Sequence, residues 1–284
     1  MKTLIPAIVI CSVIAALGNV SIADEPVTGS TPQAAAASEQ PVDAHTQSRQ
    51  ATTGMAAMEK AAKSNKYLFA LFRKEDNDQT TAMRQVLDEV MKKVADRADA
   101  VQVDVSAASE KDIVEHFEVA YAPLPLLLAI APNGAVTGGF PGRVEARRLM
   151  DAFASPGTAK CLKAFQDRKL VFLCVQNDET ESAKKAMQGV HAFKRDERFA
   201  KDTQIIVVDP SDKAESQLLS DLEIDAKSKE AVTVLFAPPG RFVGRFHGAT
   251  NLDDLVSTLV SAMSGCGSCG PGGCGSCGPG GCGH

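Results

Sequence analysis

Five of the eight cysteines in this 284-residue chain lie between Cys266 and the C-terminal His284. The stretch reads Cys-Gly-Ser-Cys-Gly-Pro-Gly-Gly twice and then closes with Cys-Gly-His. Two Cys-x-x-Cys pairs on a glycine-rich backbone can wrap a soft ion, because glycine lets the chain curl and thiolates favour Zn(II) and Cu(I). We therefore expect a zinc or Cu(I) site built from Cys266, Cys269, Cys274, Cys277, Cys282 and His284.

Two other uses of this cysteine-rich tail stay open. Cys-Gly-Ser-Cys looks like a dithiol active site, so the tail could carry electrons, although no helix follows either pair to lower a thiol pKa. Alternatively, the tail is a low-complexity segment that forms disulfides within itself or between chains. The sequence names neither the metal nor the redox state.

The N-terminus predicts export. Lys2 precedes an apolar run from Leu4 to Leu17, which is short for a membrane span, and Ser21-Ile22-Ala23 offers small residues for cleavage. We expect residues 1–23 to be a signal peptide, which makes the protein periplasmic or secreted and leaves no membrane span after cleavage. An uncleaved anchor helix is the alternative. Disulfides are permitted in either compartment.

The bulk composition is that of an ordinary globular protein. Hydrophobic residues make up 44% of the chain and charged residues 23%, and the formal net charge is −5. A net negative charge does not suggest a nucleic-acid partner. Residues 24–52 are rich in Ala, Pro, Ser, Thr and Gln, which predicts a disordered linker.

Residues 53–155 and 158–263 have the same expected order of elements, followed by the tail at 264–284. Each half runs helix, strand, helix, strand, helix, strand, strand, helix. The clearest match sets LLLAIAPNGAVTGGF over VTVLFAPPGRFVGRF, where both copies place an apolar strand, a proline-glycine turn and a second strand at equal offsets. The expected strands are residues 66–73, 100–105, 126–131, 135–140, 169–175, 204–209, 232–237 and 241–246.

This element order, with its hairpin before the last helix, resembles the thioredoxin-like family. The resemblance is clearest in NKYLFALF, in VDV at 103–105 and in EVAYAPLPLLLAIAPNG. It implies an α/β fold class, with two tandem thioredoxin-like domains, each a central mixed sheet flanked by helices. It also implies that Pro125 is the family's cis-proline, with Pro123 as the alternative, and that Ala231 stands at the equivalent place in the second copy.

The chain departs from the family where the family's chemistry lies. The Cys-x-x-Cys pair that follows the first strand falls here on Asn77-Asp78-Gln79-Thr80, so Asn77 and Thr80 take the places of the two cysteines. No cysteine occurs between Cys11 and Cys161, so no other alignment restores the pair. The first domain therefore cannot perform dithiol exchange by the family's mechanism.

The remaining chemically interesting residues have structural interpretations. The acidic loop 75–78 either caps the next helix or binds a divalent cation, and the cap is favoured. Cys174, in an apolar strand, is interpreted as a buried core residue that pairs with Cys161 only if the geometry allows. No histidine or cysteine stands at ligand spacing from His116, His191 or His247.

The sequence thus predicts an exported, redox-inactive binding scaffold rather than an enzyme. An extended peptide is expected at the loop formed by Tyr121, Pro123 and Pro125, as the resemblance implies. The two domains would serve to position the metal-binding tail. The alternatives are a thiol-disulfide oxidoreductase that uses the tail pairs, and a redox-inert, chaperone-like peptide-binding module.

Overall fold

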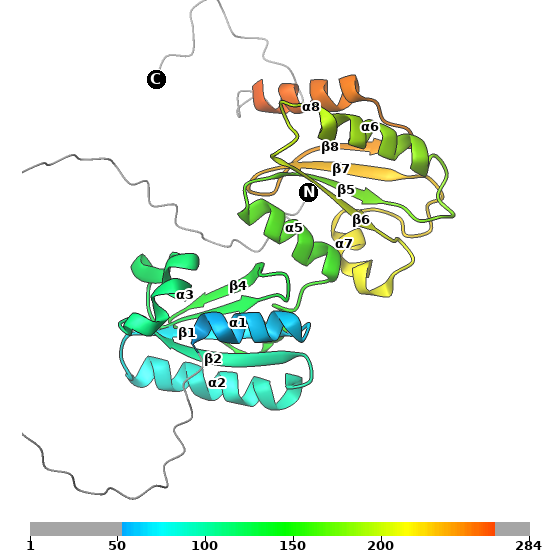
Figure 1. Cartoon of the computed structure of the whole chain (residues 1–284). Helices are drawn as coiled ribbons and strands as arrows, with labels where there is room; N and C mark the ends of the chain where they lie inside the picture. Colours follow the sequence, from blue (N-terminus) through cyan, green and yellow to red (C-terminus); the bar gives the residue numbers. More distant parts are fainter. Residues whose placement is uncertain (1–52, 265–284) are drawn as a thin grey trace, which may run out of the picture. The chain divides into compact units, whose positions relative to one another are not determined.

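The computed structural model describes residues 53–264, which contain two four-stranded sheets. Within this range no helix is both long and apolar enough to cross a membrane. The predicted signal peptide and linker, and the tail beyond Ser264, lie outside the described residues. Each domain is described by itself below (Figure 1).

The first domain has a mixed sheet with strand order β2-β1-β3-β4. The central β1 runs parallel to β2 and antiparallel to β3, and β3 and β4 form an antiparallel hairpin. All five middle residues of β1 are buried, as expected for a central strand covered on both faces. The elements are α1 (Gly54–Lys63), β1 (Tyr67–Arg73), α2 (Asp78–Val94), β2 (Ala98–Asp104), η1 (Ala108–Glu110), α3 (Lys111–His116), η2 (Val119–Tyr121), β3 (Leu126–Ile130), β4 (Val136–Pro141) and α4 (Ala146–Met150).

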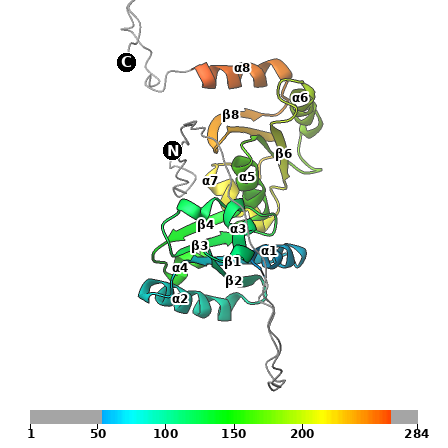
Figure 2. The ribbon, with the colours of Figure 1, turned by 60° about the vertical axis from the view of Figure 1, so that its left-hand side comes forward.

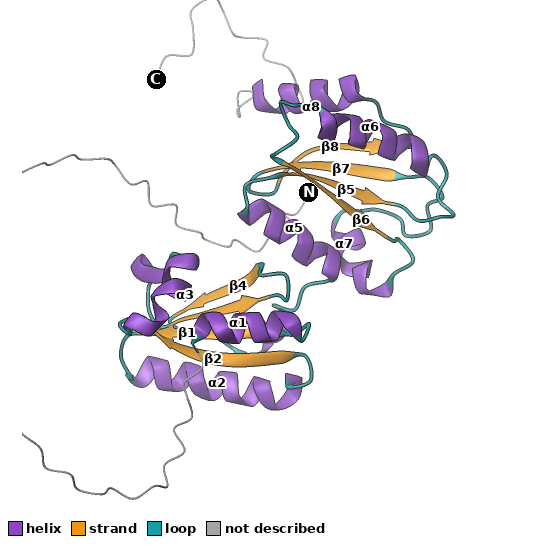
Figure 3. Cartoon of the chain, in the orientation of Figure 1, coloured by secondary structure: helices purple, strands orange, loops and turns teal. Residues whose placement is uncertain are grey.

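Helices cover both faces of this sheet (Figures 2 and 3). Side chains of α2 and α4 pack with Phe69 and Leu71 on one face. Side chains of α1 and α3 pack with Leu68 and Phe72 on the other. The alternation along β1 therefore divides the domain's core into two layers.

The second domain repeats this plan with strand order β6-β5-β7-β8. The central β5 is parallel to β6 and antiparallel to β7. Side chains of α5 and α7 contribute to one core layer, and those of α6 and α8 to the other (Figure 1). The elements are α5 (Pro156–Gln166), β5 (Leu170–Val175), α6 (Ala183–Arg195), β6 (Thr203–Val208), η3 (Lys213–Glu215), α7 (Ser216–Asp221), β7 (Val232–Ala237), β8 (Arg241–His247) and α8 (Leu252–Ser264).

Both domains cap their first helix with a glutamate that comes from the turn after the second strand. Glu110 Oε2 accepts a hydrogen bond from the Gly54 amide at 2.7 Å. Glu215 Oε1 accepts one from the Gly157 amide at 2.7 Å. A Cβ built at Gly157 would lie 2.7 Å from Glu215 Oε2, so only glycine leaves room for this carboxylate. The shared device supports the internal repeat.

The predicted fold class is confirmed: the described chain forms two tandem thioredoxin-like α/β domains with mixed sheets. Helical spacing in the sequence predicts helices at 109–117, 182–199, 212–224 and 251–263, and each differs in extent: the first divides into η1 and α3, and the second ends at Arg195. The helix expected at 212–224 divides into η3 and the short α7, because Glu215 turns inward to cap α5. The last helix continues to Ser264, one residue into the predicted tail, since no helix breaker occurs before Gly265.

Candidate functional site

The candidate site lies at the end of β1, where α2 begins. Asn77 is the N-cap of α2, and its Oδ1 accepts a hydrogen bond from the Thr80 amide at 2.9 Å. The Thr80 hydroxyl donates to the Glu75 carbonyl at 2.9 Å and lies 3.1 Å from Asn77 Oδ1. The two positions expected for the dithiol are thus joined by hydrogen bonds, and Thr80 is buried. This arrangement stabilises a helix end and offers no thiol to a substrate.

One carboxylate of the acidic loop before α2, that of Asp76, is paired with arginines. Asp76 pairs with Arg73 at 3.5 Å and also with Arg84. Arg73 reaches Asp104 at 3.7 Å as well. Within the described part of the chain, no group of three or more His, Cys, Asp or Glu residues is arranged to hold a metal ion. The loop therefore caps a helix and forms ion pairs, as the sequence favoured.

The loop before β3 lies at the same end of the sheet. The Leu124–Pro125 peptide bond is cis, so the cis-proline is Pro125 and not the alternative, Pro123. Because Phe72 pairs with Leu126 across antiparallel strands, Arg73 and Pro125 are the next neighbours along them. The structure therefore brings the Asn77–Thr80 helix end and the Pro125 loop to one end of the sheet.

Leu124 presents an unpaired stretch of backbone at this loop. Among the described residues, neither its N–H nor its C=O makes a hydrogen bond. Its side chain packs on the α1 and α3 layer of the core, which fixes the backbone in place. Tyr121, three residues before it, is 91% exposed, and Pro123 is also exposed. Sequence reasoning named Tyr121, Pro123 and Pro125 but not Leu124, because an unpaired backbone leaves no pattern in the sequence.

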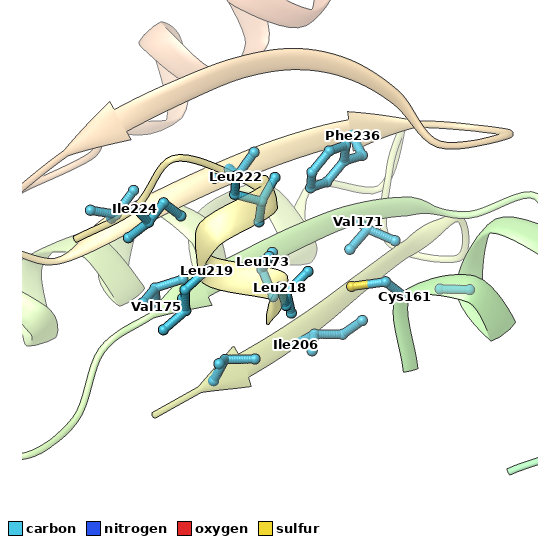
Figure 4. Close-up of a cluster of buried hydrophobic side chains, with 14 residues drawn as sticks. Cys161, Val171, Leu173, Val175, Ile206, Leu218, Leu219, Leu222, Ile224 and Phe236 are labelled. Atoms are coloured by element: carbon cyan, nitrogen blue, oxygen red, sulfur yellow. The ribbon is translucent and has the colours of Figure 1, made fainter. Parts of the chain in front are cut away.

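The two described cysteines are free and lie on opposite faces of the second sheet. Cys161, on α5, belongs to the α5 and α7 layer shown in Figure 4. Cys174, on β5, points into the α6 and α8 layer. A Cys161–Cys174 disulfide, which the sequence left open, is therefore ruled out by the sheet between them.

Burial makes both thiols unreactive. Desolvation, reinforced by the Glu215 carboxylate, raises the pKa of Cys161 from 9.0 to about 12. Desolvation raises the pKa of Cys174 from 9.0 to about 12 as well, against a smaller opposing effect from Thr233. A thiol with so high a pKa is protonated at neutral pH and is a poor nucleophile or metal ligand. The expected metal residues Cys266, Cys269, Cys274, Cys277, Cys282 and His284 lie outside the described residues.

The three histidines among residues 53–264 do not build a second site. His116 stacks edge-on against Phe117, and His247 Nδ1 lies 3.8 Å from Glu230 Oε2. His191 lines an open hollow of about 340 Å³ together with Lys194 and Arg195, all on α6. The Lys194 ammonium already donates to two backbone carbonyls, those of residues 200 and 203, at 2.5 Å each. Because these two hydrogen bonds occupy the Lys194 ammonium, this cation is not free to hold a ligand in the hollow.

Comparison with solved structures finds thioredoxins. The chain is similar to a chloroplastic thioredoxin z (TM-score 0.30, 16% identity, covering 39% of this chain and 91% of that one). It is similar to thioredoxin-2 of the malaria parasite, with a TM-score of 0.27 and 17% identity over 31% of this chain and 80% of that one. It is also similar to the germline-specific thioredoxin Deadhead of Drosophila melanogaster, with a TM-score of 0.29 and 14% identity over 35% of this chain and 90% of that one. No family model and no curated protein matches. At such low identities the matches say nothing about activity, and the fold assignment rests on strand order and direction.

Proposed function

We propose that the protein is an exported, thioredoxin-like binding scaffold without dithiol activity, whose tail takes up a soft metal ion. One observation carries the first part. Where the family places its dithiol, Asn77 and Thr80 are hydrogen-bonded to each other, and the only described thiols are buried. Catalysis by the two domains is therefore not supported, whereas binding is.

The proposed ligand of the first domain is an extended peptide. Main-chain hydrogen bonds to a free backbone edge give such a ligand affinity, and neighbouring side chains give it specificity. Leu124 supplies an unpaired donor and acceptor, and Tyr121, three residues earlier in the chain, supplies an exposed ring. An exposed aromatic side chain of this kind is a common anchor in peptide recognition.

Replacing Tyr121→Ala tests the peptide proposal. The probe is reduced, carboxymethylated α-lactalbumin, an unfolded chain without thiols, titrated by calorimetry. Because Tyr121 is the only exposed large hydrophobic side chain among the described residues of the first domain, its loss should weaken binding by about tenfold. Met263→Ala, on α8 of the second domain, removes a side chain that is also highly exposed (71%) and should leave binding unchanged. No binding by the unaltered protein would contradict the proposal.

The proposed ligand of the tail is zinc or Cu(I). Its support is the spacing of Cys266, Cys269, Cys274 and Cys277, together with the absence of any metal-ligand group among residues 53–264. Two Cys-x-x-Cys pairs supply the four sulfurs of a tetrahedral site, and Cys282 or His284 remains as a further ligand. Transfer of the ion to a partner is part of this proposal.

The metal proposal is tested with the purified protein and a variant that ends at Ser264. Both are reduced, exposed to zinc or to Cu(I), desalted and analysed for bound metal and free thiols. Metal that is bound only by the full chain supports the proposal, whereas a reduced full chain that binds none overturns it. Insulin reduction that depends on the tail cysteines would instead favour a thiol-disulfide role, which the Cys-Gly-Ser-Cys pairs make the second candidate.

A further inference from the structure

Each of the two described sheets has two edge strands, and three of these four edges carry features that discourage pairing with another strand. In the first sheet, β2 carries Asp99 and Asp104, and β4 ends in Pro141. In the second sheet, β8 carries Arg241 and Arg245. The register of β4 and of β8 against the neighbouring strand also shifts, as at a β-bulge. Charges, prolines and bulges are the devices that keep sheet edges from joining other chains.

The fourth edge, β6, has none of these features. Its sequence TQIIVV contains no charged residue, proline or glycine, and five of its six residues are β-branched. It lies at the edge of the second sheet and pairs with β5 along its whole length without a register shift (Figures 1 and 2). Val207 on this strand is 50% exposed. An uncharged, β-branched strand with one open side is a template for a further strand.

The hydrogen bonds at the two ends of β6 show which of its backbone groups face β5. The Leu170 amide donates to the Asp202 carbonyl at 2.6 Å, and the Gln176 amide donates to the Val208 carbonyl at 3.0 Å. Backbone groups of successive residues point to alternate sides of a strand, so the even-numbered residues of β6 bond to β5. The odd-numbered residues therefore point their N–H and C=O groups away from the sheet.

One of these outward groups is already occupied. The Lys194 ammonium donates to the Thr203 carbonyl at 2.5 Å, which closes the first end of the edge. Among the described residues, none bonds to the outward N–H or C=O of Ile205 or of Val207. The open part of the edge thus consists of two donors and two acceptors, on residues that are two apart.

We propose that β6 pairs antiparallel with β6 of a second copy of this chain, about a two-fold axis at Ile206. A two-fold axis there sets Ile205 of each copy opposite Val207 of the other, so all the free groups of both strands form hydrogen bonds. An axis at Ile205 would instead set Val207 opposite Thr203, whose carbonyl Lys194 already holds. The edge is therefore complementary to itself in one register, which is why a second copy is the partner that it fits.

The side chains agree with this register. Residues directly opposite each other in an antiparallel pair point to the same face, so the exposed Val207 side chain would pack against Ile205 of the other copy. Asp209 would lie opposite Thr203, so the strand ends bring no like charges together. The dimer would join the two second-domain sheets into one continuous sheet. This inference goes beyond the proposed function and does not depend on it.

The oligomeric state of the purified protein tests the proposal. Light scattering is measured over a range of concentrations with reductant and EDTA, so that the tail cannot link copies by disulfides or metal. The molar mass should rise with concentration from that of a monomer towards that of a dimer. Val207→Lys replaces an apolar cross-strand contact twice in each dimer and should raise the dissociation constant by about tenfold. Gln102→Lys, at an exposed position on the β2 edge, is the matched control and should leave it unchanged. A monomer at every concentration, or a dimer that Val207→Lys does not weaken, would overturn the proposal.

Hydrogen exchange of the unaltered protein tests the register without a variant. The amides of Ile205 and Val207 should exchange rapidly in dilute solution and more slowly as concentration rises. The Ile206 amide, which faces β5, should exchange slowly at every concentration. Slowing confined to amides outside β6 would place the dimer contact elsewhere and refute the proposal. None of these measurements involves metal or peptide, so their failure would leave the proposed function standing, and its failure would leave the dimer standing.

Discussion

The Cys161 and Cys174 thiols lie in two separate core layers, and burial raises the pKa of each from 9.0 to about 12. Below pH 9 the thiols are protonated in the folded and the unfolded chain alike, so their contribution to stability is complete there. Between pH 9 and 12 the unfolded chain loses thiol protons that the folded chain keeps. The free energy of unfolding should therefore fall as pH rises through this range.

Urea unfolding of the unaltered protein and of the Cys161→Ala/Cys174→Ala variant measures this effect. The variant should be less stable at pH 8 but should lose less stability from pH 9 to 12. Tyr67, whose pKa burial also raises, titrates in both proteins and cancels in the comparison. Parallel curves for the two proteins would show that the thiols are not buried as described.

Asn77 and Thr80 allow a direct test of what the site has lost. Their side-chain oxygens lie 3.1 Å apart, so Asn77→Cys with Thr80→Cys should give a pair that oxidises to an intramolecular disulfide. The helix N-terminus favours a thiolate at position 77, but the adjacent Asp78 carboxylate opposes it. Insulin reduction should accordingly be weak and should increase with Asp78→Asn. Mass spectrometry detects the disulfide, and Asn77→Cys alone, which should form none, is the control.

The sequence identified the residues of this site but not the hydrogen bonds that its loops make or lack. Pro125, Asn77 and Thr80 were found by counting from strands and turns, which local pattern defines well. The open backbone of Leu124 was missed, because the presence or absence of hydrogen bonds between distant loops leaves no periodicity in the sequence.

At the scale of elements, apolar strands were the most predictable. The run at 232–237 is observed as β7 with the same bounds, because a short apolar run between turn residues fits a strand covered on both faces. The region 212–224 was harder. Its apolar spacing is helical, yet the long-range bond from Gly157 to Glu215 holds three residues in a 3₁₀ turn before α7 begins.

The glutamate caps should differ in strength between the two domains. Glu215 is 4% exposed and accepts from the Gly157 amide and from the Ser155 hydroxyl, at 2.7 and 2.5 Å. Glu215→Ala leaves the buried Gly157 amide unpaired and takes from the Ser155 hydroxyl its carboxylate acceptor, leaving it only Thr158 Oγ1 at 2.9 Å, so the free energy of unfolding should fall by about 3 kcal/mol. Glu110→Ala removes one part-buried bond, and the cost should be about 1 kcal/mol. Urea unfolding of both variants measures this, and equal losses would contradict the difference in burial.

At the scale of the whole molecule, the folded cores and the proposed metal ligands belong to different parts of the chain. The described core clusters are built from apolar side chains of residues 53–264, and both thiols among them are buried. The five cysteines of the proposed metal site follow Gly265, in a stretch with no large apolar residue. Ligand uptake by the tail should therefore be independent of the stability of the domains.

Thermal unfolding with and without metal tests this independence. A ligand raises the unfolding midpoint only if it binds the folded state more tightly than the unfolded state. If the tail is independent of both cores, it should bind the metal equally well whether the domains are folded or unfolded. Zinc or Cu(I) should then protect the tail thiols from alkylation without changing the midpoint of thermal unfolding. The variant that ends at Ser264 should have the same midpoint and no protectable thiol in the folded state. A midpoint that metal raises by several degrees in both proteins would place the metal in a domain instead.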